Sequence, residues 1–250
     1  MRVHRVHLPE LMTQAEAEDG ISLHGREAHH LLHVLRVQVG QHLRVFDGQG
    51  HEAEAVIEQV DNATVTLHIS APQASDVESR WRLYAAVGLL KGDKLADVVR
   101  QLTELGVIHV QPFTSRFGDV PKVSTNKLAR WRRVAAEAAK QSGRSVVPEV
   151  AEPVSIKQLE LPSSTSLSIS LGIVAHPYAS RTLSEVLEDH QLLEQSSISL
   201  VTGPEGGLAD AELEVLTAKG FHDVSLGPRI LRAETAPIAL AAALLLPEGH

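Results

Sequence analysis

Gly203-Pro204-Glu205-Gly206-Gly207 follows the apolar run Ile198 to Val201, and LGPRILRAETAP (residues 226–237) follows a second short strand-like segment that starts at Asp223. Glycine has no side-chain wall, so a ligand can approach the main chain closely and take hydrogen bonds from it. Both blocks leave a probable strand, and in open α/β sheets ligands bind at the edge where the strands end. The two blocks therefore predict a small-molecule pocket built largely from backbone.

Each block by itself also fits an ordinary turn, because Gly-Pro and Gly-Gly are common turn residues. The first block is neither a phosphate loop of the Gly-Lys-Ser/Thr kind nor a dinucleotide-binding fingerprint. The second block carries Arg229, Arg232 and Glu234 directly before a long Ala/Leu helix that runs to Leu246. A simple connection has no need of these charges, so the two blocks together favour a site over a pair of turns.

The composition is that of a globular protein with one large or two modest domains. The 250 residues are 43% hydrophobic and 22% charged, which is ordinary for such proteins. There are no cysteines, which excludes disulfides, thiolate metal sites and a Cys nucleophile. Residues 1–20 lack the apolar core of a signal peptide, and the apolar stretch Ile238 to Leu246 is about half of what a membrane span requires. We therefore expect a cytoplasmic protein without a membrane partner.

The net charge of −8 conceals a basic segment in the middle of the chain. Residues 80–144 contain 13 Lys and Arg against 5 Asp and Glu, whereas residues 1–79 and 145–250 are both acidic. A basic segment between acidic flanks is typical of a phosphate-binding face, although a helix with a solvated basic side would give the same pattern. Because only 3% of the residues are aromatic, base stacking is scarce and phosphate contacts would dominate.

Three histidines, His29, His30 and His33, lie on one predicted helix over residues 26–34. No His-Glu-x-x-His pattern or nearby carboxylate completes a set of metal ligands around them. We therefore expect structural histidines here and no metal site in the protein.

The periodicity of the chain predicts two domains joined by a linker. Residues 1–72 read as short alternating strands with one helix, which is typical of a small barrel, and the polar residues 73–80 read as a linker. Over residues 81–250 strands alternate with helices, which predicts an α/β domain with a largely parallel sheet covered on both faces. Its predicted strands are 83–89, 107–113, 167–175, 198–201 and 223–226, and its predicted helices are 93–105, 126–142, 180–190, 209–219 and the helix that ends at 246.

Both C-terminal blocks resemble the signatures of the ribosomal RNA small subunit methyltransferase E family, which belongs to the knotted SPOUT class. Four further stretches are similar to that family and cover nearly the whole chain in order: His30 with Val34-Leu35-Arg36, Lys91-Gly92-Asp93-Lys94, Glu104-Leu105-Gly106-Val107, and Trp131 followed by Glu137, Gln141, Arg144 and Pro148. The chain departs from the family at Thr114-Ser115-Arg116, where Ser-Glu-Arg is frequent, and at Ala233, where Thr is frequent.

The resemblance implies an N-terminal PUA-like β-barrel that helps to hold RNA and a C-terminal SPOUT α/β domain that ends in a deep trefoil knot. Knots are almost absent from other proteins. The resemblance also implies a homodimer that uses S-adenosyl-L-methionine to methylate N3 of one uridine in 16S ribosomal RNA, on the assembled 30S subunit. The implied cofactor contacts are His176, Thr202, Gly203, Glu205, Gly206, Gly207, Leu226, Gly227, Ile230, Leu231 and Ala233.

Uridine N3 carries a proton and is a poor nucleophile until that proton leaves, so a base or stabilising cations must be present. Arg232 is the candidate that stabilises the developing charge, and Glu205 or Glu234 is the candidate for proton handling. Glu234 could equally cap the last helix while it pairs with Arg232. The candidate phosphate contacts are Arg2, Arg5, Arg36, Lys91, Lys94, Arg116 and Arg144.

Two other functions fit the same residues. A SPOUT enzyme could act on another RNA position, for example a ribose 2′-OH in transfer RNA. A non-enzymatic RNA-binding protein that assists ribosome assembly could keep a vestigial pocket, although the intact second block argues against this.

Overall fold

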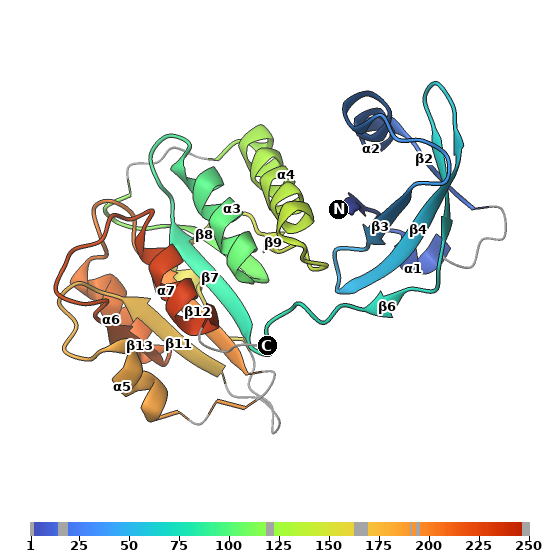
Figure 1. Cartoon of the computed structure of the whole chain (residues 1–250). Coiled ribbons are helices and arrows are strands. Elements are labelled where there is room, and N and C mark those ends of the chain that lie inside the picture. The colour runs from blue at the N-terminus through green and yellow to red at the C-terminus, as the bar shows by residue number, and fades with distance from the viewer. Residues whose placement is uncertain are drawn as a thin grey trace. The chain divides into compact units, whose positions relative to one another are not determined.

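The computed structural model describes residues 3–14, 20–118, 123–162, 170–190, 192–193 and 196–246. Its contacts divide the chain into two compact units, Met1–Glu78 with Ala139–Val147, and Ser79–Ala138 with Pro148–His250 (Figure 1). The segment 139–147 therefore packs with the N-terminal unit, although helix α4 (Thr125–Ser142) starts in the other one. Of the predicted phosphate contacts, Arg2 lies outside the described residues.

The described part of the N-terminal unit is built around a six-stranded sheet with the order β1-β3-β4-β5-β2, in which β6 pairs with β4. Apolar residues alternate along β3 and β5, so one side of each strand packs into a core that includes Leu43, Val45, Val65 and Leu67. The strands are β1 (His4–His7), β2 (Ile21–Leu23), β3 (His42–Phe46), β4 (His51–Val60), β5 (Val65–Ile69) and β6 (Gln73–Ala74).

Two details of this unit differ from the sequence-based prediction. The helix predicted over 26–34 is α-helical only over α2 (Gly25–His29) and continues as the π-helical η1 (His30–Leu35), which ends at Arg36 with a left-handed φ of 52°. The segment expected to be a linker contains β6, because a strand can pair through its backbone without periodic side chains. The short helix α1 (Leu11–Gln14) was not predicted.

The described part of the C-terminal unit contains a seven-stranded sheet with the order β10-β8-β7-β12-β11-β13, in which β9 pairs with β8. Its strand pairs are parallel, as the alternation of strands and helices predicted. The strands are β7 (Arg82–Gly88), β8 (His109–Thr114), β9 (Glu149–Val150), β10 (Val154–Ser155), β11 (Ser170–Ala175), β12 (Ser197–Thr202) and β13 (Phe221–Val224).

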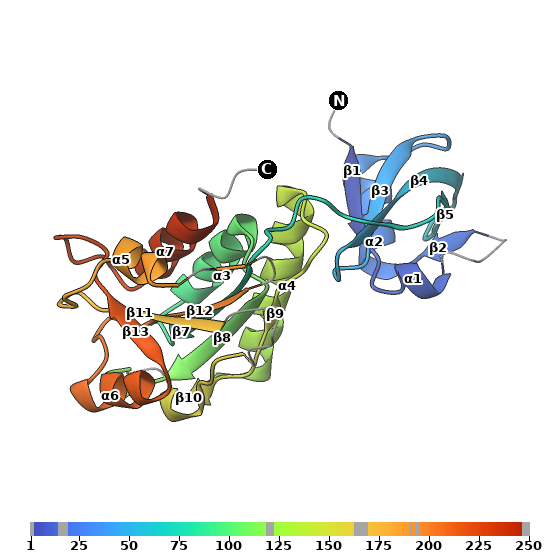
Figure 2. The same ribbon diagram turned by 90° about the horizontal axis from the view of Figure 1, so that it is seen from below.

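Helices cover both faces of this sheet, as expected for strands that are apolar on both sides (Figure 2). On one face α3 (Lys94–Leu105) packs against α7 (Ala236–Leu245), which contacts β12, β11 and β7. On the other face α6 (Asp210–Ala218) packs with the short helix η2 (Ile156–Gln158), and Leu216 and Phe221 join the core there. Figure 2 shows α3 and α7 on the opposite side of the sheet from α6.

Most predicted boundaries in this unit lie within a few residues of the observed ones. Gly106 ends α3 with a left-handed φ of 114°, as its position in the sequence predicted. Helix α5 (Leu183–Glu188) is shorter than predicted because Thr182 caps it: its hydroxyl accepts from the Glu185 N–H, and the Glu185 carboxylate accepts from the Thr182 N–H. Of the predicted strand 167–175, residues 167–169 lie outside the described part. None of the described helices is both long and apolar enough to cross a bilayer.

Candidate active site

A cavity of about 620 Å³ lies at the carboxyl ends of β11 and β12. Parallel strands end at the same edge of a sheet, so the segments that leave β11 and β12 meet there. Residues 230–234, which precede α7, and Ala236, the first residue of α7, form a third wall of the cavity. The cavity brings together nine of the eleven residues predicted to hold a cofactor: His176, Thr202, Gly203, Glu205, Gly206, Gly207, Ile230, Leu231 and Ala233. Leu226 and Gly227, the other two, are not among its lining residues.

The glycine loop after β12 is packed so tightly that side chains would not fit. A Cβ atom on Gly206 would lie 2.7 Å from Cβ and 2.8 Å from the backbone oxygen of Phe117. Gly207 has a φ of 74°, which residues with a side chain rarely adopt. The loop therefore requires glycine for its own conformation, and the same glycines leave backbone atoms on the cavity wall.

Thr202, the last residue of β12, lines the cavity and is only 1% exposed. Its hydroxyl oxygen has no hydrogen-bond partner within the described part of the chain. A buried polar group normally has a partner, and leaving one without costs about 1–3 kcal/mol. An orphaned hydroxyl in the wall of a cavity is the arrangement expected where a polar ligand supplies the partner.

Two acidic side chains of the cavity share one lysine. The ammonium of Lys94, the first residue of α3, lies 3.3 Å from Oε1 of Glu205 and 3.3 Å from Oε2 of Glu234. The Glu234 carboxylate, followed by that of Glu205, raises the pKa of Lys94. Burial alone would raise the pKa of Glu205, but hydrogen bonds from its own N–H, from the Lys91 N–H and from Lys94 hold the pKa below its usual value.

Glu234 is also ionised, because a hydrogen bond from its own N–H, supported by Lys94, lowers its pKa. It does not cap the last helix: α7 has Thr235 at its N-cap, without a capping side-chain bond. Arg232 is exposed on the cavity rim, and its positive charge contributes to the lowered pKa of Glu234. The alternative hypothesis paired Glu234 with Arg232. In the structure the hydrogen-bonded partner of Glu234 is Lys94.

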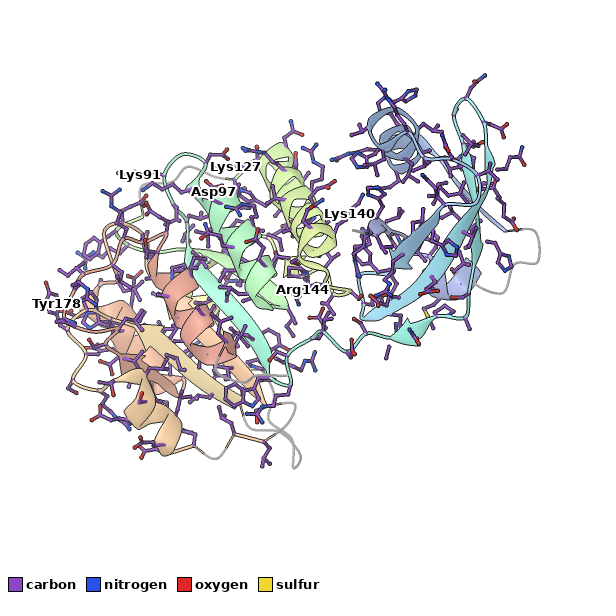
Figure 3. The ribbon with its side chains drawn as sticks, in the orientation of Figure 1. Lys91, Asp97, Lys127, Lys140, Arg144 and Tyr178 are labelled. Atoms are coloured by element: carbon purple, nitrogen blue, oxygen red, sulfur yellow. The ribbon has the colours of Figure 1, made fainter. Side chains whose placement is uncertain are left out.

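Lys94 and Tyr178 are among the lining residues that were not predicted as part of the pocket. Lys94 was assigned to RNA phosphates because it lies in the basic segment, and its partners come from parts of the chain more than 100 residues away. Tyr178, labelled in Figure 3, follows the predicted His176 in the loop after β11 and remains 80% exposed at the cavity. Tyr178 could have been predicted from the sequence, because it is an aromatic residue two positions after the predicted contact His176.

Some of the predicted phosphate contacts are exposed, whereas others form hydrogen bonds and ion pairs with other residues of the protein. Arg36, Lys91 and Arg116 are exposed, and the guanidinium of Arg116 lies 5.7 Å from the ring centre of Phe117. Arg144 is 4% exposed and binds the Glu78 carboxylate through Nη2 and Nε at 2.6 and 3.0 Å. Figure 3 labels Arg144 and Lys140 near the end of α4.

Arg5 is engaged in the same way within the N-terminal unit. Its guanidinium donates to Oε2 of Glu52 at 3.0 Å, to the Ser145 hydroxyl at 3.0 Å and to the Arg144 carbonyl at 3.1 Å. These bonds fasten segment 139–147 to the strands of this unit. The structure gives Arg5 and Arg144 protein partners in place of the phosphate contacts that the sequence suggested.

The histidines of the described residues do not form a metal-binding cluster. Within the described residues, no group of three or more His, Cys, Asp or Glu side chains is placed so that it could hold a metal ion. His29 and His33 contact each other with ring centres 4.5 Å apart, and neither is among the residues that line the cavity.

The sequence matches two protein families. Residues 77–245 match the RNA methyltransferase domain, and residues 23–70 match the RNA methyltransferase PUA domain. The chain belongs to the ribosomal RNA small subunit methyltransferase E family, because it is more than 30% identical to proteins of that name over most of both chains. The first match covers more than half of the chain, including every residue that lines the cavity, and the second covers the strands β3 to β5.

Two relatives that carry this family name are similar to this chain over most of its length. The chain is 37% identical over 225 residues to ribosomal RNA small subunit methyltransferase E of Synechocystis sp., covering 90% of the chain and 72% of the relative. It is 34% identical over 239 residues to the Bacillus subtilis protein of that name, covering 92% and 91%. The solved Neisseria gonorrhoeae protein of that name, bound to S-adenosyl methionine, gives a TM-score of 0.82 with 28% identity over 98% of each chain.

A methyltransferase of Legionella pneumophila, solved in complex with the cofactor SAM, also gives a TM-score of 0.82, with 28% identity over 99% of this chain and 98% of that one. The family membership confirms the expected PUA domain and the α/β methyltransferase domain with a parallel sheet. It also places the protein among enzymes that methylate RNA.

Proposed function

We propose that the protein transfers a methyl group from S-adenosyl-L-methionine to N3 of a specific uridine in 16S ribosomal RNA, on the assembled small subunit. The observation that carries the proposal is the cavity at the ends of β11 and β12, in which both glycine-bearing segments and four charged side chains meet. Two proteins with the same fold, from Neisseria gonorrhoeae and Legionella pneumophila, are bound to this cofactor in their solved structures.

The lining residues suit S-adenosyl-L-methionine. A volume of about 620 Å³ lies in the range of pockets that enclose small ligands, roughly 300–1,000 Å³. The glycines expose backbone donors and acceptors that suit the adenosine and amino-acid groups of the cofactor. The Thr202 hydroxyl, which has no partner within the described residues, can form a further hydrogen bond. When bound, the cofactor supplies a methyl group that its sulfonium has already activated, so the protein must mainly align the two reactants.

We assign two different roles to the charged residues of the cavity. Arg232 lies on the cavity rim, where a cation stabilises negative charge that develops on the uracil ring. Glu205 and Glu234 carry lowered pKa values and already accept hydrogen bonds, so they are weak proton acceptors. We therefore assign them to holding the cation Lys94 in place rather than to removing the N3 proton.

We further propose that the N-terminal unit is a PUA-like barrel and that the C-terminal unit contains a trefoil knot, as the family resemblance implies. A PUA-like barrel is supported by the ten-residue strand β4, whose register shift between Ile57 and Gln59 bends it as a bulge does. A C-terminal trefoil knot is supported by the path of the chain: β13 pairs at the sheet edge beside β11, and α7 then returns to pack on β12 and β7.

We propose that the enzyme acts as a homodimer. A groove of about 610 Å³ runs along α3 and α7, and its floor includes the apolar Ile238, Ala239 and Ala242. It shares Lys94 and Glu234 with the cavity, so a second copy seated there would adjoin the active site. Light scattering during gel filtration should give twice the mass of one chain, and an Ile238→Glu variant should give a single-chain mass.

The experiment that tests the function is nucleoside analysis of 30S subunits incubated with the protein and methyl-labelled cofactor. The expected product is N3-methyluridine at one position, and Arg232→Ala should abolish its formation while calorimetry still shows cofactor binding. A labelled ribose in place of the base would favour the alternative RNA target. Absence of cofactor binding by the wild type would favour the non-enzymatic RNA-binding protein.

Contact with RNA phosphates is proposed for Arg36, Lys91 and Arg116, which are exposed. Their contribution should appear as an affinity for RNA that falls steeply with salt concentration, because each neutralised phosphate releases counterions.

A further inference from the structure

Lys94 occupies a position that its local structure disfavours. It is the first residue of α3, where the positive end of the helix dipole repels a cation. Sequences that break a local rule of this kind do so most often at functional sites, where another part of the structure compensates. Here the compensation comes from Glu205 and Glu234, each 3.3 Å from the Lys94 ammonium.

The same lysine forms the boundary between two hollows. Lys94 and Glu234 line both the cavity at the ends of β11 and β12 and the groove along α3 and α7. The Lys94 side chain is 41% exposed. A group that approaches a ligand in the cavity from the groove therefore passes this ammonium. Figure 3 labels Lys91 and Asp97, which flank Lys94 along the chain at the start of α3.

The two carboxylates hold Lys94 but do not use all of its donors. An ammonium has three N–H donors, and the bonds to Glu205 and Glu234 engage two of them within the described part of the chain. Oε1 of Glu205 also accepts from the Lys91 N–H at 3.2 Å, which fixes the carboxylate that orients the lysine. One donor of Lys94 remains for a ligand.

We propose that Lys94 is a catalytic residue that donates a hydrogen bond to a carbonyl oxygen of the target base, beside the nitrogen that is methylated. This inference rests on the proposed function. The N3–H bond breaks and its proton passes to hydroxide from the solvent, while the negative charge spreads onto the carbonyl oxygens, where Lys94 stabilises it. The nitrogen electron pair then forms the N–CH₃ bond, and the electron pair of the breaking S–CH₃ bond stays on sulfur.

The proposal accounts for loss of the N3 proton although both carboxylates of this site are engaged with Lys94. An imide next to two carbonyl groups loses its proton to solvent when nearby cations stabilise the anion, and Lys94 and Arg232 supply two cations. Among the described lining residues, the other ionisable groups of the two hollows are Asp97, Arg100, His176 and Tyr178, together with Glu205 and Glu234.

The test compares Lys94→Met and Lys94→Arg with Lys157→Met as the matched control. Lys157 is an exposed lysine on η2 and is not among the residues that line either hollow. Single-turnover methyl transfer to 30S subunits is measured against pH at saturating RNA, and calorimetry measures cofactor affinity in each variant.

Lys94→Met should lower the maximal rate about 100-fold, as removal of one donor to a developing anion does in other enzymes. The rising limb of its pH profile should move to higher pH, because the anion is harder to form. Cofactor affinity should be retained, which also shows that the variant is folded. Lys94→Arg should recover part of the rate, and Lys157→Met should match the wild type.

Four results would overturn the proposal. A normal maximal rate with weaker, less salt-dependent RNA binding in Lys94→Met would make Lys94 a phosphate contact. Loss of cofactor binding in that variant would make it part of the cofactor site. A wild type that forms no N3-methyluridine would remove the proposed function together with this inference, whereas a wild type and a Lys94→Met variant with equal rates and equal pH profiles would remove the inference alone.

Discussion

Gly88, the last residue of β7, lies so close to Pro204 that a Cβ atom on it would come within 2.5 Å of the Pro204 nitrogen. The same atom would lie 2.9 Å from the carbonyl carbon of Gly203, so backbone atoms block it and cannot move aside as a flexible side chain could. The glycine at the end of one strand therefore determines where the glycine loop of the next strand in the sheet can lie.

Gly88→Ala should displace the glycine loop and weaken both folding and cofactor binding. Forcing one methyl group into a filled site costs roughly 1–3 kcal/mol, which thermal denaturation and calorimetry with S-adenosyl-L-methionine would both detect. Gly118→Ala is the matched control, because its Cβ would meet Ser115 atoms only at ordinary contact distance, 3.4 Å. Equal melting temperatures for Gly88→Ala and the wild type would contradict the prediction.

Thr202→Val should separate stability from ligand binding. Valine has the shape of threonine without the hydroxyl that lacks a partner in the cavity wall. Removing a buried, unsatisfied polar group should stabilise the ligand-free protein by about 1 kcal/mol, whereas cofactor affinity should fall roughly fivefold if the hydroxyl bonds the ligand. A melting curve and a binding isotherm on the same samples measure both effects. A variant that is more stable and binds equally well would show that the hydroxyl makes no such bond.

Arg144→Met should destabilise the N-terminal unit rather than weaken RNA binding alone. It leaves the Glu78 carboxylate, whose side chain is only 19% exposed, without its bidentate partner. Breaking one side of a buried ion pair costs about 3–5 kcal/mol. Adding Glu78→Gln should restore part of the loss, and this double-mutant comparison measures the pair itself. Unchanged unfolding together with a shallower salt dependence of RNA binding would instead restore Arg144 as a phosphate contact.

Asp47→Asn should give a pH-dependent loss of stability. Asp47 is 3% exposed; burial would raise its pKa, but hydrogen bonds from the His51 and Gln49 N–H groups outweigh burial and lower it. A carboxyl with a lowered native pKa contributes stability above its unfolded pKa and loses it as the pH falls through the native value. The variant should therefore be less stable by about 1–3 kcal/mol at neutral pH.

Below the ordinary Asp pKa of about 3.9 the unfolded wild type takes up a proton at Asp47 more readily than the native state does, so the difference between the two proteins should shrink. Denaturant unfolding at a series of pH values measures this trend. Asp76→Asn, which changes an exposed carboxylate, is the control and should show no such trend. A difference in stability that stays constant down to low pH would contradict the assignment.

Much of the cavity could be predicted from the sequence because its walls are formed by loops whose conformation depends on neighbouring residues. Gly203 to Gly207 and the segment before α7 each leave a strand or enter a helix, and turn residues and strand ends are determined within a few neighbouring residues. The same reasoning predicted the parallel sheet and its helices, since strand and helix periods differ. Nine cofactor candidates therefore line one cavity.

Only the tertiary structure decided how the charges are paired. Lys94 reads as one more cation in a basic segment, and nothing near it in the sequence points to Glu205 or Glu234 as its partners. The same holds for Arg144, whose partner Glu78 is 66 residues away, and for Gly88, whose need for glycine depends on Pro204. Local patterns determine where the chain turns. Which side chains then face one another depends on how the strands are ordered in the sheet, because that order brings distant segments to a common edge.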